Sequence, residues 1–136
     1  MKLIVCLDDQ NGMLFGGKRQ SRDRAVCEKI LSITQGAMLW MNHYSYPLFA
    51  DMKTRVAVDD AFLSLAAEED WCFVENTDVC PYFDSVSQII IFKWNRRYPA
   101  DMVFSAELTG GTWKLTQSED FSGYSHDRIT MEVYTR

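Results

Sequence analysis

A stretch near the carboxyl end reads RITMEVY at residues 128–134. Its apolar residues Ile129, Met131 and Val133 alternate with more polar ones. This period of two is typical of an antiparallel strand with one buried face. A second stretch with strand character, WKLTQS at residues 113–118, precedes it across a loop that contains glycine. We therefore expect an antiparallel pair of strands in this part of the chain.

The part of the chain before this pair alternates predicted strands with predicted helices. Apolar and β-branched segments are predicted as strands at residues 2–7, 37–41, 54–58, 71–74 and 88–94. Helical segments are expected at residues 21–35, 43–51 and 59–69, with one or two further turns within 77–87. Strands alternating with helices, followed by an all-β end, predict an α/β fold. In this fold helices flank a central mixed sheet that ends in an antiparallel C-terminal hairpin.

A glycine-rich segment separates the first strand from the first helix. Residues 8–20 read DDQNGMLFGGKRQ and are predicted as a long loop. Either Ser21 or Asp23 is expected to cap the helix that follows, because short polar side chains accept hydrogen bonds from a helix start. The helix is expected to end near Gln35, since Gly36 suits a C-terminal cap.

Length and charge restrict the class of protein. The chain has 136 residues, 47% hydrophobic and 24% charged, which predicts one domain over residues 1–136. The net charge of −5 argues against a nucleic-acid-binding protein, which needs a basic face. No stretch reaches the ~18 apolar residues of a membrane span, and the apolar run at residues 3–7 is too short for a signal peptide. We therefore expect a cytoplasmic protein with no membrane partner.

The cysteines and histidines form no known metal or catalytic motif. None of the four cysteines belongs to a CxxC pair, and Cys6 and Cys72 lie in apolar runs, so reduced thiols are expected. The two histidines, His43 and His126, are too few for an HxHxDH zinc cluster and form no HExxH motif, so no metal is expected. The nucleotide-binding motifs GxGxxG and GxxxxGK[ST] and the nucleophile motif GxSxG are also missing.

Several stretches, in their order along the chain, resemble the dihydrofolate reductase family. The family's first strand and mobile active-site loop are matched by KLIVCLDDQNGML at residues 2–14, and its second strand and following turn by MLWMNHYSY at 38–46. A later strand and loop are matched by IIIFKWNRRYPADMVF at residues 89–104. The final hairpin is matched by residues 113–136, with their first tryptophan and closing EVYxR pattern. The resemblance implies the family's fold over nearly the whole chain, shortened near residues 49–56.

The family's catalytic acid has no clear counterpart in this sequence. The resemblance implies a carboxylic acid on the first long helix, where it binds the pterin ring, but an ungapped comparison places Val26 there. Asp23 lies three residues earlier, nearly one helical turn away, and requires a gap in the preceding loop to reach this position. The threonine that bonds to the family's acid falls at Phe92, which forms no such hydrogen bond.

The family's cofactor-binding positions are also replaced. A Gly-Gly pair that lets backbone approach the nicotinamide and pyrophosphate corresponds to Glu75 and Asn76 here. A carboxylate repels phosphates and two Cβ atoms prevent close approach. The family's Gly-Arg pair becomes Asn42 and His43, and Arg55 is the one arginine left near the shortened segment.

Two hypotheses about function follow. The first is a diverged scaffold without reductase activity and without cofactor, which binds an unknown small molecule or protein partner. The alternative is an NADPH-dependent reductase of altered specificity with Asp23 as its acid. Whether the protein is an enzyme stays uncertain, but the joint loss of acid, glycine pair and arginines favours the first hypothesis.

A ligand cleft, if present, is expected at the carboxyl ends of the strands. Its candidate residues are Asp8, Asp23, Cys27, Asn42, His43, Tyr44, Glu75 and Asn76. Structural roles are the alternative for several of them: a helix cap or aromatic packing at residues 43–44, core packing at Cys27 and a solvent-facing strand end at Glu75. A homodimer is a further possibility, since Trp94 and nearby aromatic residues suit an interface.

Overall fold

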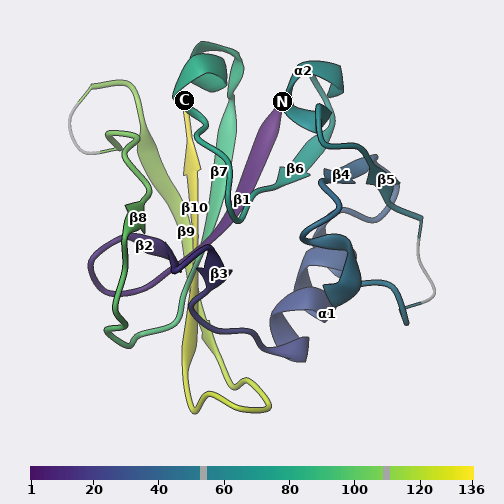
Figure 1. Cartoon of the computed structure of the whole chain (residues 1–136). Helices are drawn as coiled ribbons and strands as arrows, with labels where there is room; N and C mark the ends of the chain where they lie inside the picture. The colour runs from purple at the N-terminus through teal and green to yellow at the C-terminus, as the bar shows by residue number, and fades with distance from the viewer. Residues whose placement is uncertain (53–54, 109–110) are drawn as a thin grey trace.

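The computed structural model describes residues 1–52, 55–108 and 111–136, and a seven-stranded sheet runs through it (Figure 1). The strand order is β5-β4-β6-β1-β7-β10-β9. Their bounds are β1 Lys2–Leu7, β4 Leu39–Met41, β5 Ala57–Val58, β6 Trp71–Phe73, β7 Gln88–Lys93, β9 Lys114–Phe121 and β10 Ile129–Thr135. The predicted strands are therefore present, although Thr54, in the predicted strand 54–58, lies outside the described residues.

The sheet is mixed, as the sequence predicts. Strand β1 pairs in parallel with β6 and β7, and β4 pairs in parallel with β5 and β6. Strand β10 pairs antiparallel with both β7 and β9. The predicted C-terminal hairpin thus extends an otherwise parallel sheet.

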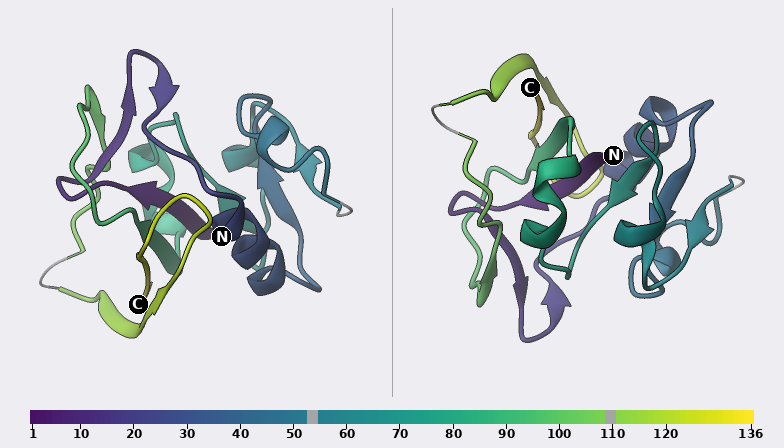
Figure 2. Two further views of the ribbon diagram at one scale, coloured as in Figure 1. Left: turned by 90° about the horizontal axis from the view of Figure 1, so that it is seen from below. Right: turned by 90° about the horizontal axis from the view of Figure 1, so that it is seen from above.

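Alternating side chains of the central strands form two cores, one on each face of the sheet. On β1, Leu3 and Val5 face one core and Ile4 faces the other. Helix α1, Arg24–Ile33, covers the second core with Val26, Cys27 and Ile30. Figure 2 shows this helix beside the sheet, with the β9–β10 loop near its first turn. Both chain termini lie at the opposite end of the sheet (Figure 1), near the segment that precedes β7.

The helices after α1 are shorter than expected. Residues 43–51 contain the 3-10 helix η1, Tyr46–Leu48, and 59–69 contain only α2, Phe62–Leu65. The 3-10 helix η2, Cys80–Ser85, lies within the predicted turns at 77–87. Proline in the first turn of both 3-10 helices removes a backbone donor, and such short segments do not propagate an α-helix.

The segment at residues 8–20 is not the long loop that the sequence analysis expects. It contains a hairpin of β2, Gly12–Phe15, and β3, Lys18–Arg19, and β2 also pairs with β8, Met102–Val103. Gly16 and Gly17 connect the two strands with φ angles of 60° and 75°, which is the backbone of a tight hairpin turn that glycine favours. The apolar run before a Gly-Gly pair was the signal for this hairpin.

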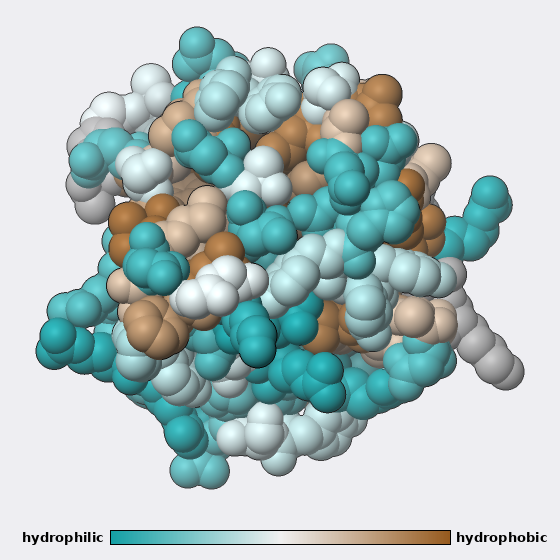
Figure 3. Space-filling view, in the orientation of Figure 1, coloured by the Kyte–Doolittle hydropathy of each residue, from teal (hydrophilic) through white to brown (hydrophobic). Residues whose placement is uncertain are grey.

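Strands β3, β2 and β8 form a second, three-stranded sheet. Its surface carries some of the exposed apolar side chains. Phe15 on β2 and Val103 on β8 are both about half exposed. In Figure 3 a brown area lies on the side of the molecule where Figure 1 places β2 and β8, within a mainly hydrophilic face. Within the described part of the chain, no helix is long and apolar enough to cross a membrane.

Candidate binding cleft

The carboxyl ends of β4 and β6 face the β2–β3 hairpin, and polar side chains from all three segments meet there. Tyr44 and Ser45 follow β4, Glu75 follows β6, and Arg19 ends β3. The hairpin is held in this place because Gln20, next to Arg19, donates to Asp8 just after β1 at 3.0 Å. This is the position where an open α/β sheet holds a ligand.

Arg19 and Glu75 form a bidentate ion pair in the middle of this group. Nε of Arg19 donates to Oε2 of Glu75 at 2.8 Å, and Nη2 donates to Oε1 at 3.0 Å. The side chain of Glu75 is only 8% exposed and that of Arg19 21%. Two parallel charge-assisted bonds in a largely buried place make this a strong and geometrically specific contact.

Two neighbours complete the surroundings of the pair. The Arg19 guanidinium lies 4.5 Å from the centre of the Tyr44 ring, and its Nη2 also donates to the Tyr44 carbonyl at 3.3 Å. The Tyr44 hydroxyl accepts from the Arg19 backbone N–H at 2.8 Å, and the Ser45 hydroxyl donates to Glu75 at 2.8 Å. Both charged groups therefore have hydrogen-bond partners in place of water.

Asn42 and Asn76 join the ends of β4 and β6 beside the ion pair. The Asn42 amide donates to the Asn76 side-chain oxygen at 2.7 Å, while the Asn42 oxygen accepts from the Ser45 backbone N–H at 3.1 Å. The buried amide thus fixes the turn that presents Ser45 to Glu75.

Two thiols lie within electrostatic reach of the same ion pair. Burial, and then the carboxylate of Glu75, raise the pKa of Cys27 to about 11. The same two causes raise the pKa of the Cys6 thiol well above its usual value. Both cysteines therefore carry protons at neutral pH and behave as small apolar side chains, not as nucleophiles.

The space left among these side chains is very small. A cavity of about 10 Å³ remains beside Arg19 and Glu75, lined also by Cys6, Ser21 and Trp94. About one water molecule fits in such a volume. A far larger cavity, of about 870 Å³, lies elsewhere, between the end of α1 and β5. Among the described residues, no group of three or more His, Cys, Asp or Glu side chains is placed to hold a metal ion.

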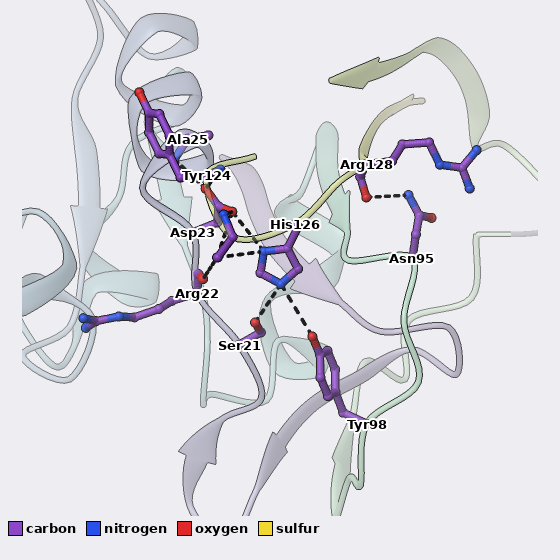
Figure 4. A network of polar contacts seen from close by, with 10 residues as sticks. Ser21, Arg22, Asp23, Ala25, Asn95, Tyr98, Tyr124, His126 and Arg128 are labelled. Atoms are coloured by element: carbon purple, nitrogen blue, oxygen red, sulfur yellow. Dashed lines mark hydrogen bonds and ion pairs between the residues drawn. The ribbon is translucent and has the colours of Figure 1, made fainter. Parts of the chain in front are cut away.

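A second polar network lies at the start of α1 (Figure 4). Asp23 caps the helix by accepting from the Ala25 N–H at 2.9 Å, and its Oδ2 lies 2.9 Å from Nδ1 of His126 in the β9–β10 loop. It also accepts from the backbone N–H groups of Tyr124 and Ser125. Burial alone raises the pKa of a carboxyl, but the bonds from His126 and the N–H groups outweigh it and hold the pKa of Asp23 well below its usual range.

The Asp23 network has the atom order of a serine–histidine–aspartate triad. Nε2 of His126 lies 2.9 Å from the Ser21 hydroxyl, and its ring stacks on Trp94 with centroids 4.6 Å apart. The cavity that Ser21 lines holds no more than about one water, so this conformation leaves no room for an acyl group beside the hydroxyl. The network therefore acts as a clasp between the helix start and the β9–β10 loop.

Comparison with known proteins agrees with this architecture. No protein-family model matches the sequence, and no curated protein matches it significantly. A solved structure with the same arrangement is dihydrofolate reductase from Enterococcus faecalis, complexed with NADP(H) and RAB-propyl. The TM-score is 0.68, over 99% of this chain and 95% of that chain, at 12% sequence identity. The chain has the dihydrofolate reductase-like fold. The likeness at this identity establishes the fold and not the activity.

The dihydrofolate reductase-like fold brings together only some of the predicted cleft residues. Asn42, Tyr44, Glu75 and Asn76 meet in one group, and Cys27 lies near it. The alternative for Glu75, a solvent-facing strand end, is wrong, because its carboxylate is buried against Arg19. The charge of Glu75 is therefore paired with that of Arg19.

The other predicted residues lie in separate contacts. Asp8 is buried and accepts from the backbone N–H groups of Gln10, Gly12 and Tyr98, so it holds two loops together. Burial alone raises the pKa of Asp8, but these bonds and one from Gln20 outweigh that effect and lower it. His43 is exposed and contacts Asp60 at 3.0 Å. Asp23 belongs to the clasp, and Val26 is buried in the core.

Sequence reasoning missed Arg19, Ser45 and His126. Arg19 lay in a segment expected to be a loop, and a single arginine there carries no signal of its partner. Ser45 stood next to two candidates but was not singled out. His126 reaches the cap residue Asp23 through the conformation of the β9–β10 loop, and no local sequence pattern indicates this contact.

Proposed function

We propose that this protein is a cytoplasmic, non-catalytic member of the dihydrofolate reductase-like fold that binds a small molecule or protein partner. It uses no nicotinamide cofactor and does not reduce folates. The observation that carries this proposal is the Arg19–Glu75 ion pair, which fills the cleft at the carboxyl ends of β4 and β6.

A nicotinamide dinucleotide would first have to displace this pair. Separating a buried ion pair costs about 3 kcal/mol, because each charge loses its partner. That cost alone lowers the affinity of any ligand that does not replace the lost contacts by roughly 100-fold. The phosphates of a dinucleotide cannot replace Arg19 as a partner of Glu75, since both are negatively charged.

The position of Asp23 supports the same proposal. A catalytic acid needs a free oxygen that faces its substrate. Both Asp23 oxygens already accept hydrogen bonds, from the start of α1 and from the β9–β10 loop. Asp23 lines a cavity of about 280 Å³ together with Cys27 and Leu48, but the bonds of the clasp hold its pKa well below its usual range, so it carries no proton to donate at neutral pH.

Titration with NADPH tests the proposal. Trp94 lines the small cavity beside Arg19 and stacks on His126, so a nicotinamide in the cleft should change its fluorescence. We expect no saturable change up to millimolar NADPH and no dihydrofolate-dependent oxidation of NADPH at 340 nm. A dihydrofolate reductase serves as the positive control. Saturable binding at micromolar NADPH would refute the proposal.

One observation favours a second candidate, an NADPH-dependent reductase of altered specificity. The similar structure from Enterococcus faecalis is described as a complex with NADP(H). For this chain to act in that way, the hairpin that carries Arg19 must swing out of the cleft. NADPH binding together with substrate-dependent oxidation in the titration would support this candidate.

A further inference from the structure

The cleft contains a recess whose shape and charge fit one chemical group. We define the guanidinium recess as the Tyr44 ring and carbonyl together with the carboxylate of Glu75 and the Ser45 hydroxyl. Two carboxylate oxygens accept from two different nitrogens of Arg19, at 2.8 and 3.0 Å, while the Tyr44 carbonyl lies 3.3 Å from one of them. The Tyr44 ring covers the flat face of the group at 4.5 Å.

This set of contacts distinguishes a guanidinium from other cations. A planar fork of N–H donors matches the two carboxylate oxygens, and a planar cation stacks on an aromatic face. An ammonium group is a compact point charge that offers no flat face and no fixed fork. The contacts of the recess therefore match planar, delocalised cations, including amidinium groups.

Arg19, which fills the recess, belongs to a short segment of the chain. Strand β3 has two residues, and its pairing with β2 consists of Leu14 with Arg19 and Phe15 with Lys18. The Arg19 side chain is 21% exposed, so part of it is in contact with solvent. The hairpin belongs to a separate three-stranded sheet, so moving it to withdraw Arg19 would break no strand pair of the seven-stranded sheet.

Once Arg19 withdraws, a cation with two parallel N–H donors satisfies the recess best. Glu75 is 8% exposed, and a buried carboxylate without a partner is costly. A neutral ligand leaves that charge unpaired, and a carboxylate or phosphate repels it. We propose that the guanidinium recess binds the guanidinium or amidinium group of an external ligand, and that Arg19 occupies it in the free protein. The inference rests on the proposed function, since it takes the cleft not to be a nicotinamide site.

The Arg19→Ala variant tests the inference by chemical rescue. N-ethylguanidinium has the atoms that this substitution removes from the recess. At about ten times its Kd it should raise the melting temperature of the variant by about 5 °C. The same concentration of N-ethylammonium should raise it by less than about a third of that. The double variant Arg19→Ala/Glu75→Gln should lose the response to N-ethylguanidinium.

A matched control comes from a surface arginine. Arg24 pairs with Asp51 at 3.0 Å, but both side chains are more than half exposed. The Arg24→Ala variant should show no specific response to N-ethylguanidinium, because no recess surrounds its partner. An equal response in this control, or an equal response to N-ethylammonium in Arg19→Ala, would overturn the inference.

Hydrogen exchange of the wild-type chain provides a second test if Arg19→Ala does not fold. The Arg19 amide donates to the Tyr44 hydroxyl, so displacing Arg19 should speed its exchange at least several-fold. N-ethylguanidinium and the peptide acetyl-Ala-Arg-Ala-amide are the two probes. A response to the first alone indicates a small-molecule ligand, and a response to the peptide indicates an arginine side chain of a partner. No response to either contradicts the inference, whereas only NADPH binding contradicts the proposed function.

Discussion

Arg19 and Glu75 stand 56 positions apart in the sequence and meet through two hydrogen bonds. Because both side chains are largely buried, removing either one leaves the other charge without water and without a partner, which destabilises the fold. Tyr44 and Ser45 supply the remaining contacts and fix the geometry. At the scale of single residues, the state of the cleft is therefore set by one ion pair.

Substituting both Arg19 and Glu75 should lower the free energy of unfolding by less than the sum of the two single substitutions. We expect Arg19→Met and Glu75→Met each to lower the free energy of unfolding by about 3 kcal/mol, since each leaves one buried charge alone. The double variant should recover at least about 1 kcal/mol relative to the sum, as measured by urea unfolding. The exposed pair Arg24 and Asp51 is the control, with an expected coupling below about 1 kcal/mol. Strict additivity at Arg19 and Glu75 would show that the pair is not coupled.

At the scale of elements, the β9–β10 loop and the start of α1 are joined by the clasp. Asp23 comes from the helix cap, and His126 and two backbone N–H groups come from the loop (Figure 4). Gly123 passes so close that a Cβ at this position would collide with the Asp23 carboxylate. The clasp therefore links the first helix to the C-terminal hairpin, about a hundred residues later in the sequence.

Because of the clasp, the free energy of unfolding should fall at acidic pH. The pKa of Asp23 is lower in the folded chain than its unfolded value of about 3.9, so its contribution is present above about pH 4 and is lost as the pH falls below it. Asp23→Asn should cost about 2 kcal/mol at pH 7. The difference from the wild type should shrink between pH 5 and pH 3 in urea unfolding.

Asp51→Asn, at an exposed ion pair, is the control for this measurement and should follow the wild-type pH curve. The pKa of Asp8 is also lowered in the folded chain, so acid reduces the free energy of unfolding of every variant through Asp8 as well. Only the difference between the pH curves of a variant and the wild type therefore reports on Asp23. A difference between Asp23→Asn and wild type that stays constant from pH 7 to pH 3 would contradict a charged clasp.

Elements were predicted better than contacts. Alternation at residues 128–134 and apolar runs such as 2–7 predicted strands, because hydrophobic periodicity reports burial directly. Local chemistry leaves Ser21 and Asp23 as candidate caps, and the structure has Asp23 as the cap. The Arg19 and His126 contacts do not follow from local chemistry, because they depend on where a hairpin and a loop fold back in space. The hairpin at residues 12–19 is not predicted, because a Gly-Gly pair is typical both of a tight hairpin turn and of a loop.

At the scale of the whole molecule, the chain combines the dihydrofolate reductase-like fold with a cleft filled by its own side chains. The order of strands in the large sheet places the ends of β4 and β6 side by side. The hairpin of β2 and β3 brings Arg19 to the same place. The dihydrofolate reductase-like fold is thus present, and a salt bridge lies at the ends of β4 and β6.

The most direct measurement is a crystal structure of the wild-type chain grown with millimolar NADPH. The proposal predicts that the bidentate contact between Arg19 and Glu75 is intact and that no dinucleotide lies beside Glu75 and Asn76. A nicotinamide seated against these two residues, with Arg19 turned out to solvent, would contradict it.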